Sequence, residues 1–202
     1  MKNTLFLECS PFGKESSGAR LVQAALGENG LSAQGVRLVT RSLAAEPLTP
    51  LSAHYAKALT SLAPDNEPEL ALSERLISEL EACSRLLIAT PMHNFTVPAT
   101  LKLWIDYVLR IGRSFASTPE GKVGLLGDRP ALVLVRSGGA CSGDRARQPD
   151  FLTPYLRHAL ATVGIDSVQF VYLAGPTVSE DDLSHARRAL AAFLPAATTL
   201  PA

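Results

Sequence analysis

The strongest constraint on the fold is the alternation of short apolar runs with longer amphipathic stretches. The clearest run, Ala-Leu-Val-Leu-Val at 131–135, is continuous, as is typical of a strand buried on both faces of a parallel sheet. Similar runs predict four further strands at 4–7, 36–39, 85–90 and 168–173. Because helical patterns separate these runs, we expect a parallel sheet with helices on both faces.

Three of the predicted strands end in loops of small or polar residues, at 10–18, 91–97 and 136–143. These are the first, third and fourth strands, which are neighbours in the order 2-1-3-4-5. Ligands of open α/β sheets bind at the carboxyl ends of the strands, where the strand order reverses. We therefore predict a flavodoxin-like three-layer sandwich with a five-stranded parallel sheet of this order. Residues 1–202 are expected to form this single domain, with one crevice collecting the three loops.

Composition excludes several classes of protein. The hydrophobic content of 47% and the charged content of 19% are typical of a globular chain, and the net charge of +0 gives no basic surplus for nucleic acid or an anionic membrane. Cys9, Cys83 and Cys141 are far apart and lack C-x-x-C spacing, which argues against disulfides and a zinc site. No membrane span and no secretion signal is recognisable, so we expect a cytoplasmic protein without a metal.

The loop at 10–18 has the composition of an anion site. Ser16 or Ser17 can cap the helix that follows, and the capping residue lies among unpaired N–H groups at the positive end of the helix dipole. Phosphate is the usual occupant of such a place. The loop matches neither the G-x-G-x-x-G pattern nor the P-loop, which gives little support to a dinucleotide or ATP site. The alternative is a plain helix cap without a ligand.

Two other loops have features of ligand contacts. Pro91 and Pro98 stiffen the loop after the third strand, where Asn94 and the main chain can bind the edge of a flat ligand. The alternative is an ordinary connection between a strand and a helix. Gly138 and Gly139 follow the fourth strand and would let a ligand approach the main chain closely, unless they form only a flexible turn.

The remaining segments give further expectations. Trp104 follows helical spacing and is expected in the core. The segment 112–130 is rich in glycine and predicts a hairpin or irregular excursion, in which Phe115 faces a ligand or a partner subunit. The long connection 41–66 is expected to hold a short helix with His54 and Tyr55. His54, His158 and His185 are expected in solvent.

Several segments together resemble one known family. Pro-Met-His-Asn-Phe at 91–95 is similar to the P-M-Y-N-F loop of the FMN-dependent NADH:quinone oxidoreductases known as azoreductases, and 98–106 resembles the helix that follows it. Arg-Ser-Gly-Gly at 136–139 stands where the family has S-R-G-G. The segments 150–156 and 163–165 are also similar to the family. The resemblance covers nearly the whole chain.

The resemblance implies an enzyme that carries FMN and takes electrons from NADH or NADPH. It reduces quinones and azo compounds by two-electron ping-pong transfer. A homodimer is also implied, in which the connection 41–66 and the excursion near Phe115 complete the partner's pocket. The residues implied to hold the FMN phosphate are Ser10, Ser16, Ser17 and Gly18. Those implied to line the flavin ring are Met92, His93, Asn94 and Phe95, with Arg136, Ser137, Gly138 and Gly139 approaching another part of it.

The sequence departs from the family at several places. His93 replaces a tyrosine, Gly18 replaces a hydroxyl residue, and Arg136 and Ser137 reverse the usual order. The chemistry lies on FMN, so no catalytic side chain is required, although His93 is a candidate proton donor.

Two other functions are compatible with parts of the sequence. One is a flavodoxin-type electron carrier without substrate turnover, although such carriers are usually strongly acidic and this chain is neutral. The other is a hydrolase that uses Ser10 or Ser16 with His93, although no G-x-S-x-G elbow is present.

Overall fold

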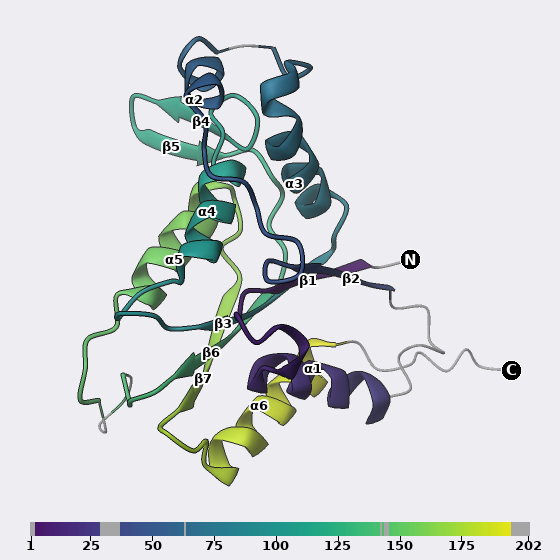
Figure 1. The fold of residues 1–202 in the computed structure, drawn as a ribbon, viewed down its shortest axis with the longest axis vertical. Helices are drawn as coiled ribbons and strands as arrows, with labels where there is room; N and C mark the ends of the chain where they lie inside the picture. The colour runs from purple at the N-terminus through teal and green to yellow at the C-terminus, as the bar shows by residue number, and fades with distance from the viewer. Residues whose placement is uncertain (1–2, 29–36, 63, 142, 144–145, 195–202) are drawn as a thin grey trace, which may run out of the picture.

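A computed structural model describes residues 3–28, 37–62, 64–141, 143 and 146–194, which form three layers around a parallel sheet (Figure 1). The strands of the sheet are β1 (Asn3–Glu8), β2 (Arg37–Ser42), β3 (Arg85–Pro91), β6 (Ala131–Ser137) and β7 (Val168–Ala174). Their order, β2-β1-β3-β6-β7, is the predicted 2-1-3-4-5 once a separate hairpin is left out of the count. Val36, at the start of the predicted second strand, lies outside the described residues, and β2 continues to Ser42.

Helices cover both faces of the sheet (Figure 1). One face carries α3 (Ala71–Glu81), α4 (Ala99–Val108) and α5 (Leu152–Thr162), and the other carries α1 (Ser17–Glu28) and α6 (Glu180–Phe193). Strand side chains alternate between the faces, so Leu5 and Leu7 pack toward the first set of helices and Phe6 toward the second. Trp104 is 1% exposed in the first core, which confirms its predicted place.

The excursion after α4 is a hairpin of β4 (Phe115–Thr118) and β5 (Gly121–Gly124), outside the main sheet. Gly124 in the hairpin and Gly164 in the turn after α5 allow these two segments to lie close together. A Cβ on Gly124 would lie 2.1 Å from the main-chain nitrogen of Gly164. Next to this contact, Leu126 N–H donates to the Val163 carbonyl at 3.1 Å. Only a glycine at position 124 permits so close an approach of the two backbones.

The connection after β2 contains the predicted short helix, α2 (Ala53–Thr60). Ser52 caps it, because its side chain accepts a hydrogen bond from the Tyr55 N–H at 3.0 Å. The Tyr55 ring packs edge-on against Tyr107 with ring centroids 5.0 Å apart, so the helix is tied to α4. In the described part of the chain, no helix is long and apolar enough to cross a membrane.

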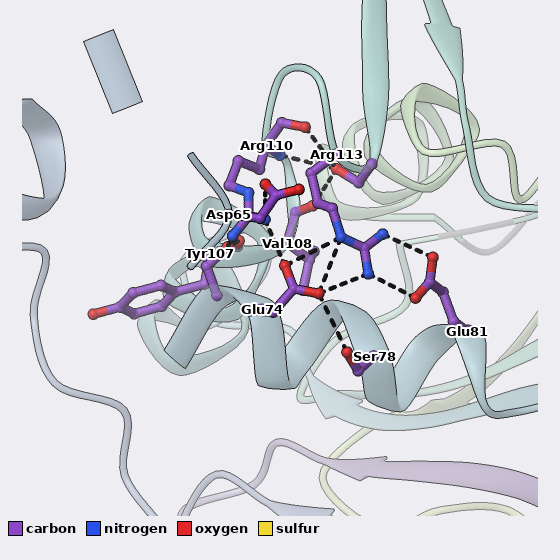
Figure 2. A network of polar contacts seen from close by, with 10 residues as sticks. Asp65, Glu74, Ser78, Glu81, Tyr107, Val108, Arg110 and Arg113 are labelled. Atoms are coloured by element: carbon purple, nitrogen blue, oxygen red, sulfur yellow. Dashed lines mark hydrogen bonds and ion pairs between the residues drawn. The ribbon is translucent and has the colours of Figure 1, made fainter. Parts of the chain in front are cut away.

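An ion-pair network joins α3 to the segment between α4 and the hairpin (Figure 2). Arg110, whose side chain is 3% exposed, contacts Asp65 at 2.8 Å and Glu74 at 2.5 Å. Arg113 contacts the same Glu74 at 2.8 Å and Glu81 at 2.7 Å. Glu74 is therefore shared by two guanidinium groups and fixes the direction in which the chain leaves α4.

Candidate functional site

A cavity of roughly 190 Å³ opens between the N-terminus of α1 and the carboxyl ends of β3, β6 and β7. Six of the residues predicted for the site line it, namely Ser10, Ser16, Ser17, Gly18, His93 and Arg136. The lining also contains residues that the sequence reasoning missed, namely Pro11, Phe12, Glu15, Ala89, Thr90, Pro91, Leu134 and Leu173. The three predicted loops therefore do meet at one place, as the strand order requires.

The N-terminus of α1 supplies hydrogen-bond donors to this cavity. Ser16 is the cap, because its Oγ accepts the Ala19 N–H at 3.2 Å, and Ser17 is the first helical residue. The N–H groups of Ser17 and Gly18 have no acceptor within the described ranges. Free donors at the positive end of a helix dipole favour an anion such as a phosphate group.

Gly18 lets α1 begin close to the sheet. A Cβ at this position would lie 2.8 Å from the Cβ of Ala89 in β3, a distance too short for two methyl groups. The glycine that replaces the family's hydroxyl residue therefore has a steric role. The sequence showed the missing hydroxyl but not the contact, because Ala89 lies 71 residues further along the chain.

Arg136 brings a positive charge to the opposite wall of the cavity. Its guanidinium donates to the main-chain carbonyls of Leu173 and Pro176, each at 3.1 Å, which holds it at the ends of β6 and β7. Throughout the described residues it forms no ion pair with a carboxylate, whereas the one acidic residue of the lining, Glu15, pairs with Arg20 at 2.6 Å. A phosphate monoester fits this set of donors.

The loop after β3 forms a tight turn. His93 N–H donates to the Thr96 carbonyl at 3.0 Å, and Thr96 N–H donates back to the His93 carbonyl at 3.1 Å. The two central residues, Asn94 and Phe95, have φ of +47° and +72°, as a type I′ turn requires. Asparagine tolerates this region, but a phenylalanine there is strained and is 45% exposed. Strain of this kind is concentrated at functional sites.

The His93 side chain lies between the main cavity and a smaller one of roughly 140 Å³ near the start of α4. In the described part of the structure, no hydrogen bond joins its imidazole to Ser10 or Ser16. The Ser10 Oγ instead accepts the Phe12 N–H at 3.2 Å, and the Ser16 Oγ caps α1. The arrangement that a serine hydrolase needs is thus not assembled.

The other predicted residues lie outside the lining of the main cavity, namely Met92, Asn94, Phe95, Ser137, Gly138 and Gly139. Ser137 is 1% exposed, and its hydroxyl donates to the Gly139 carbonyl at 2.6 Å while accepting the Gln148 amide at 3.0 Å. Its side chain is thus hydrogen-bonded within the protein, and its contact with a ligand stays a prediction. The spacing of Ser137 and Gln148 in the sequence does not predict the hydrogen bond between them. Gly138 has open space where a Cβ would stand, as the close approach of a ligand requires.

Behind this loop, a polar cluster ties α5 to β7. Tyr172 donates to the Asp150 carboxylate, and that carboxylate also accepts the Thr153 N–H at 2.9 Å. Burial and the bond to Asp150 both raise the pKa of Tyr172. Burial acts to raise the pKa of Asp150, but the bonds from Tyr172 and Thr153 outweigh it and lower that pKa.

The cysteines near the site are buried and protonated. Burial raises the pKa of the Cys9 thiol, and the charge of Glu8 raises it further. Burial also raises the pKa of the Cys141 thiol. Because the thiolate is the reactive form, both side chains act as small fillers.

The remaining candidates have simple environments. His54, His158 and His185 are exposed, as predicted. Phe115 is 8% exposed in the single chain, with the Lys122 ammonium 5.1 Å from its ring centroid, and its contact with a ligand or a partner subunit stays a prediction. Within the described ranges, no group of three or more His, Cys, Asp or Glu side chains is placed to hold a metal ion.

Comparison with known proteins agrees with the fold and with the resemblance found in the sequence. A family profile described as "Flavodoxin-like fold" matches residues 2–194. The chain is 58% identical to FMN-dependent NADH:quinone oxidoreductase 5 of Burkholderia lata, covering 90% of this chain and 88% of that protein. It is 53% identical to FMN-dependent NADH:quinone oxidoreductase 4 of Pseudomonas fluorescens, covering 94% of each. The chain belongs to the FMN-dependent NADH:quinone oxidoreductase family.

Solved structures of other proteins share the fold. An azoreductase from Bacillus anthracis str. Sterne superimposes with a TM-score of 0.81 at 21% identity, covering 96% of this chain and all (100%) of that one. An FMN-dependent NADH-azoreductase from the Ames Ancestor strain, in complex with FMN, gives a TM-score of 0.74 at 22% identity, covering 95% and 97%. The family membership predicted from the loops at 91–95 and 136–139 is therefore confirmed.

Proposed function

We propose that this chain uses FMN to pass electrons from NADH or NADPH to quinones and azo compounds, two at a time in a ping-pong sequence. The observation that carries the proposal is the cavity at the N-terminus of α1, in a chain 58% identical to a named FMN-dependent NADH:quinone oxidoreductase. Its free N–H groups at Ser17 and Gly18 and the charge of Arg136 suit the phosphate of FMN.

The protein's part is to bind and orient the cofactor. Ser10, Ser16, Ser17, Gly18 and Arg136 would hold the phosphate. The turn at 93–96 and the main chain at 138–139 would flank the ring. Bound FMN would supply the chemistry, taking a hydride from the nicotinamide and then delivering two electrons to the acceptor.

Two elements of the chain would assist that chemistry. N–H groups at Gly138 and Gly139 can stabilise negative charge on a reduced ring, because Gly138 leaves its main chain open to a ligand. Protons can come from water, and His93 at the edge of the cavity is the candidate side-chain donor.

We also propose that residues 1–202 act as one domain in a cytoplasmic homodimer. The support is a set of exposed apolar side chains in the connection after β2 and around the hairpin, namely Leu51 at 41%, Ile111 at 41%, Val123 at 50% and Leu125 at 51%. Light scattering after size-exclusion chromatography tests the dimer, and a monomer at micromolar concentration would reject it.

Initial-rate kinetics test the catalytic proposal. FMN-loaded protein is assayed with NADH against a benzoquinone and, separately, an azo dye. The proposal predicts turnover with both acceptors and parallel lines in double-reciprocal plots, because the donor leaves before the acceptor binds. Intersecting lines would reject the ping-pong sequence. Absence of turnover with every acceptor, in protein that retains its FMN, would reject the enzyme itself.

A further inference from the structure

We propose that Glu8 is a positioning residue that sets the shape of the anion-binding loop 10–18. This inference rests on the proposed binding of FMN. Glu8 is the last residue of β1 and is 2% exposed. A carboxylate at so buried a place requires compensation by hydrogen bonds or a cation.

The compensation comes from two neutral donors, one in the anion-binding loop and one at the end of β2. One oxygen, Oε1, accepts the Ser10 N–H at 2.8 Å, and the other, Oε2, accepts the Ser42 hydroxyl at 2.8 Å. Glu8 forms no ion pair in the described part of the chain. The side chain thus bridges the first turn of the anion-binding loop and the end of β2.

Ser10 in turn determines the course of the loop. Its carbonyl accepts the Gly13 N–H at 3.0 Å, and its hydroxyl accepts the Phe12 N–H at 3.2 Å. The Gly13 carbonyl then accepts the Ser16 N–H at 3.0 Å, and Ser16 caps α1. An unbroken series of hydrogen bonds therefore runs from Glu8 to Ser16, the residue directly before the free donors at Ser17 and Gly18.

The middle of this loop, at 11–15, borders a further cavity. This cavity, of roughly 470 Å³, lies between the loop and β2. Glu8 lines it together with Phe12, Gly13 and Lys14 of the loop and with Ser42. A segment with a hollow on either side depends on its hydrogen bonds for a fixed shape, and the bond from the Ser10 N–H to Glu8 ties its beginning to the end of β1.

Glu8 acts through the hydrogen bonds that hold the loop in place and not through its charge. A negative charge behind an anion site opposes phosphate binding. Glutamine can keep both bonds, because its Oε1 accepts the Ser10 N–H and its Nε2 donates to the Ser42 oxygen. Glu8→Gln therefore retains the anchor without the charge, whereas Glu8→Ala removes both.

The test compares FMN with riboflavin, which lacks the phosphate, by fluorescence titration of flavin-free protein. For Glu8→Ala we expect the Kd for FMN to rise at least about tenfold and the Kd for riboflavin to change less than about threefold. For Glu8→Gln we expect FMN affinity at least equal to that of the wild type. A general loss of structure would instead weaken both flavins equally.

Three outcomes would overturn the inference. They are an equal loss for both flavins in Glu8→Ala, an unchanged Kd for FMN in that variant, or a Glu8→Gln protein as weak as Glu8→Ala. If Glu8→Ala does not fold, Ser42→Ala serves instead, because it removes one end of the bridge and should weaken FMN alone. An unchanged FMN affinity in Ser42→Ala would then overturn the inference. Wild-type protein that binds neither flavin would reject the proposed function instead.

Discussion

The main chain of Gly18, at the start of α1, packs directly on the methyl group of Ala89 in β3. A Cβ on Gly18 would stand 2.8 Å from that methyl carbon. This contact sets how near the free N–H groups of α1 come to the carboxyl ends of the strands. The anion site thus depends on two small residues that are distant in sequence.

Gly18→Ala should therefore move the N-terminus of α1 away from β3. We expect the Kd for FMN to rise at least about tenfold, measured by flavin fluorescence. Gly27→Ala is the matched control in the same helix, since a Cβ there meets nothing within 4 Å. The control should keep its FMN affinity and gain about 0.5–1 kcal/mol of stability. Equal affinities in the two variants would contradict this role of Gly18.

The strained conformation of Phe95 predicts that two variants at this position differ in stability and that both lose activity. With φ at +72°, Phe95→Gly should be more stable than Phe95→Ala by about 1 kcal/mol, because only glycine adopts this region without strain. Both variants should turn over acceptors more slowly than the wild type, because they lack the ring. Urea unfolding gives the stabilities. An alanine variant as stable as the glycine variant would show that the turn is not strained.

The network in Figure 2 predicts unequal effects for its two glutamates. Glu74→Gln leaves Arg110, 3% exposed, with a weaker partner and should cost about 2 kcal/mol, less than a fully buried pair because Glu74 is 32% exposed. Glu81→Gln breaks a pair at 44% exposure and should cost less than about 1 kcal/mol. Urea unfolding at neutral pH measures both. A larger cost for Glu81→Gln would contradict this ranking.

The same network predicts a loss of stability in acid. Hydrogen bonds from Arg113 lower the pKa of Glu74 and of Glu81 below the ordinary value. The folded protein then binds fewer protons than the unfolded chain, so this stability is fully present above about pH 4.5 and falls as the pH drops through the lowered pKa values. Urea unfolding between pH 6 and about pH 3 should show the decline, with a shallower slope in the double variant Glu74→Gln/Glu81→Gln. An identical slope in that variant would show that these pairs do not cause it.

The sequence predicted those features that local pattern determines. Continuous apolar runs located the five strands of the sheet, helical spacing placed Trp104 in the core, and small residues at strand ends located the loops that meet at the cavity. The flavodoxin-like order 2-1-3-4-5 makes the strands that carry these loops neighbours, and the structure has this order.

Features that depend on distant partners were missed. Glu8 directly after an apolar run was a visible signal of a buried carboxylate, but Ser42 as its partner was not. Gly18 was noted only as the loss of a hydroxyl, because the sequence does not place Ala89 against it. The hydrogen bond from Gln148 to Ser137 was missed for the same reason. The contact of Lys122 with the Phe115 ring was also missed, because only the folded hairpin brings the two together.

The most direct test of the central claim is the visible absorption spectrum of the FMN-loaded protein before and after NADH is added without oxygen. The account predicts a flavin band that NADH bleaches and that a quinone then restores. A band that NADH leaves intact would contradict the reductase and favour an electron carrier. A protein that stays colourless when FMN is added would contradict the assignment of the cavity at Ser16, Ser17 and Gly18 to a flavin phosphate.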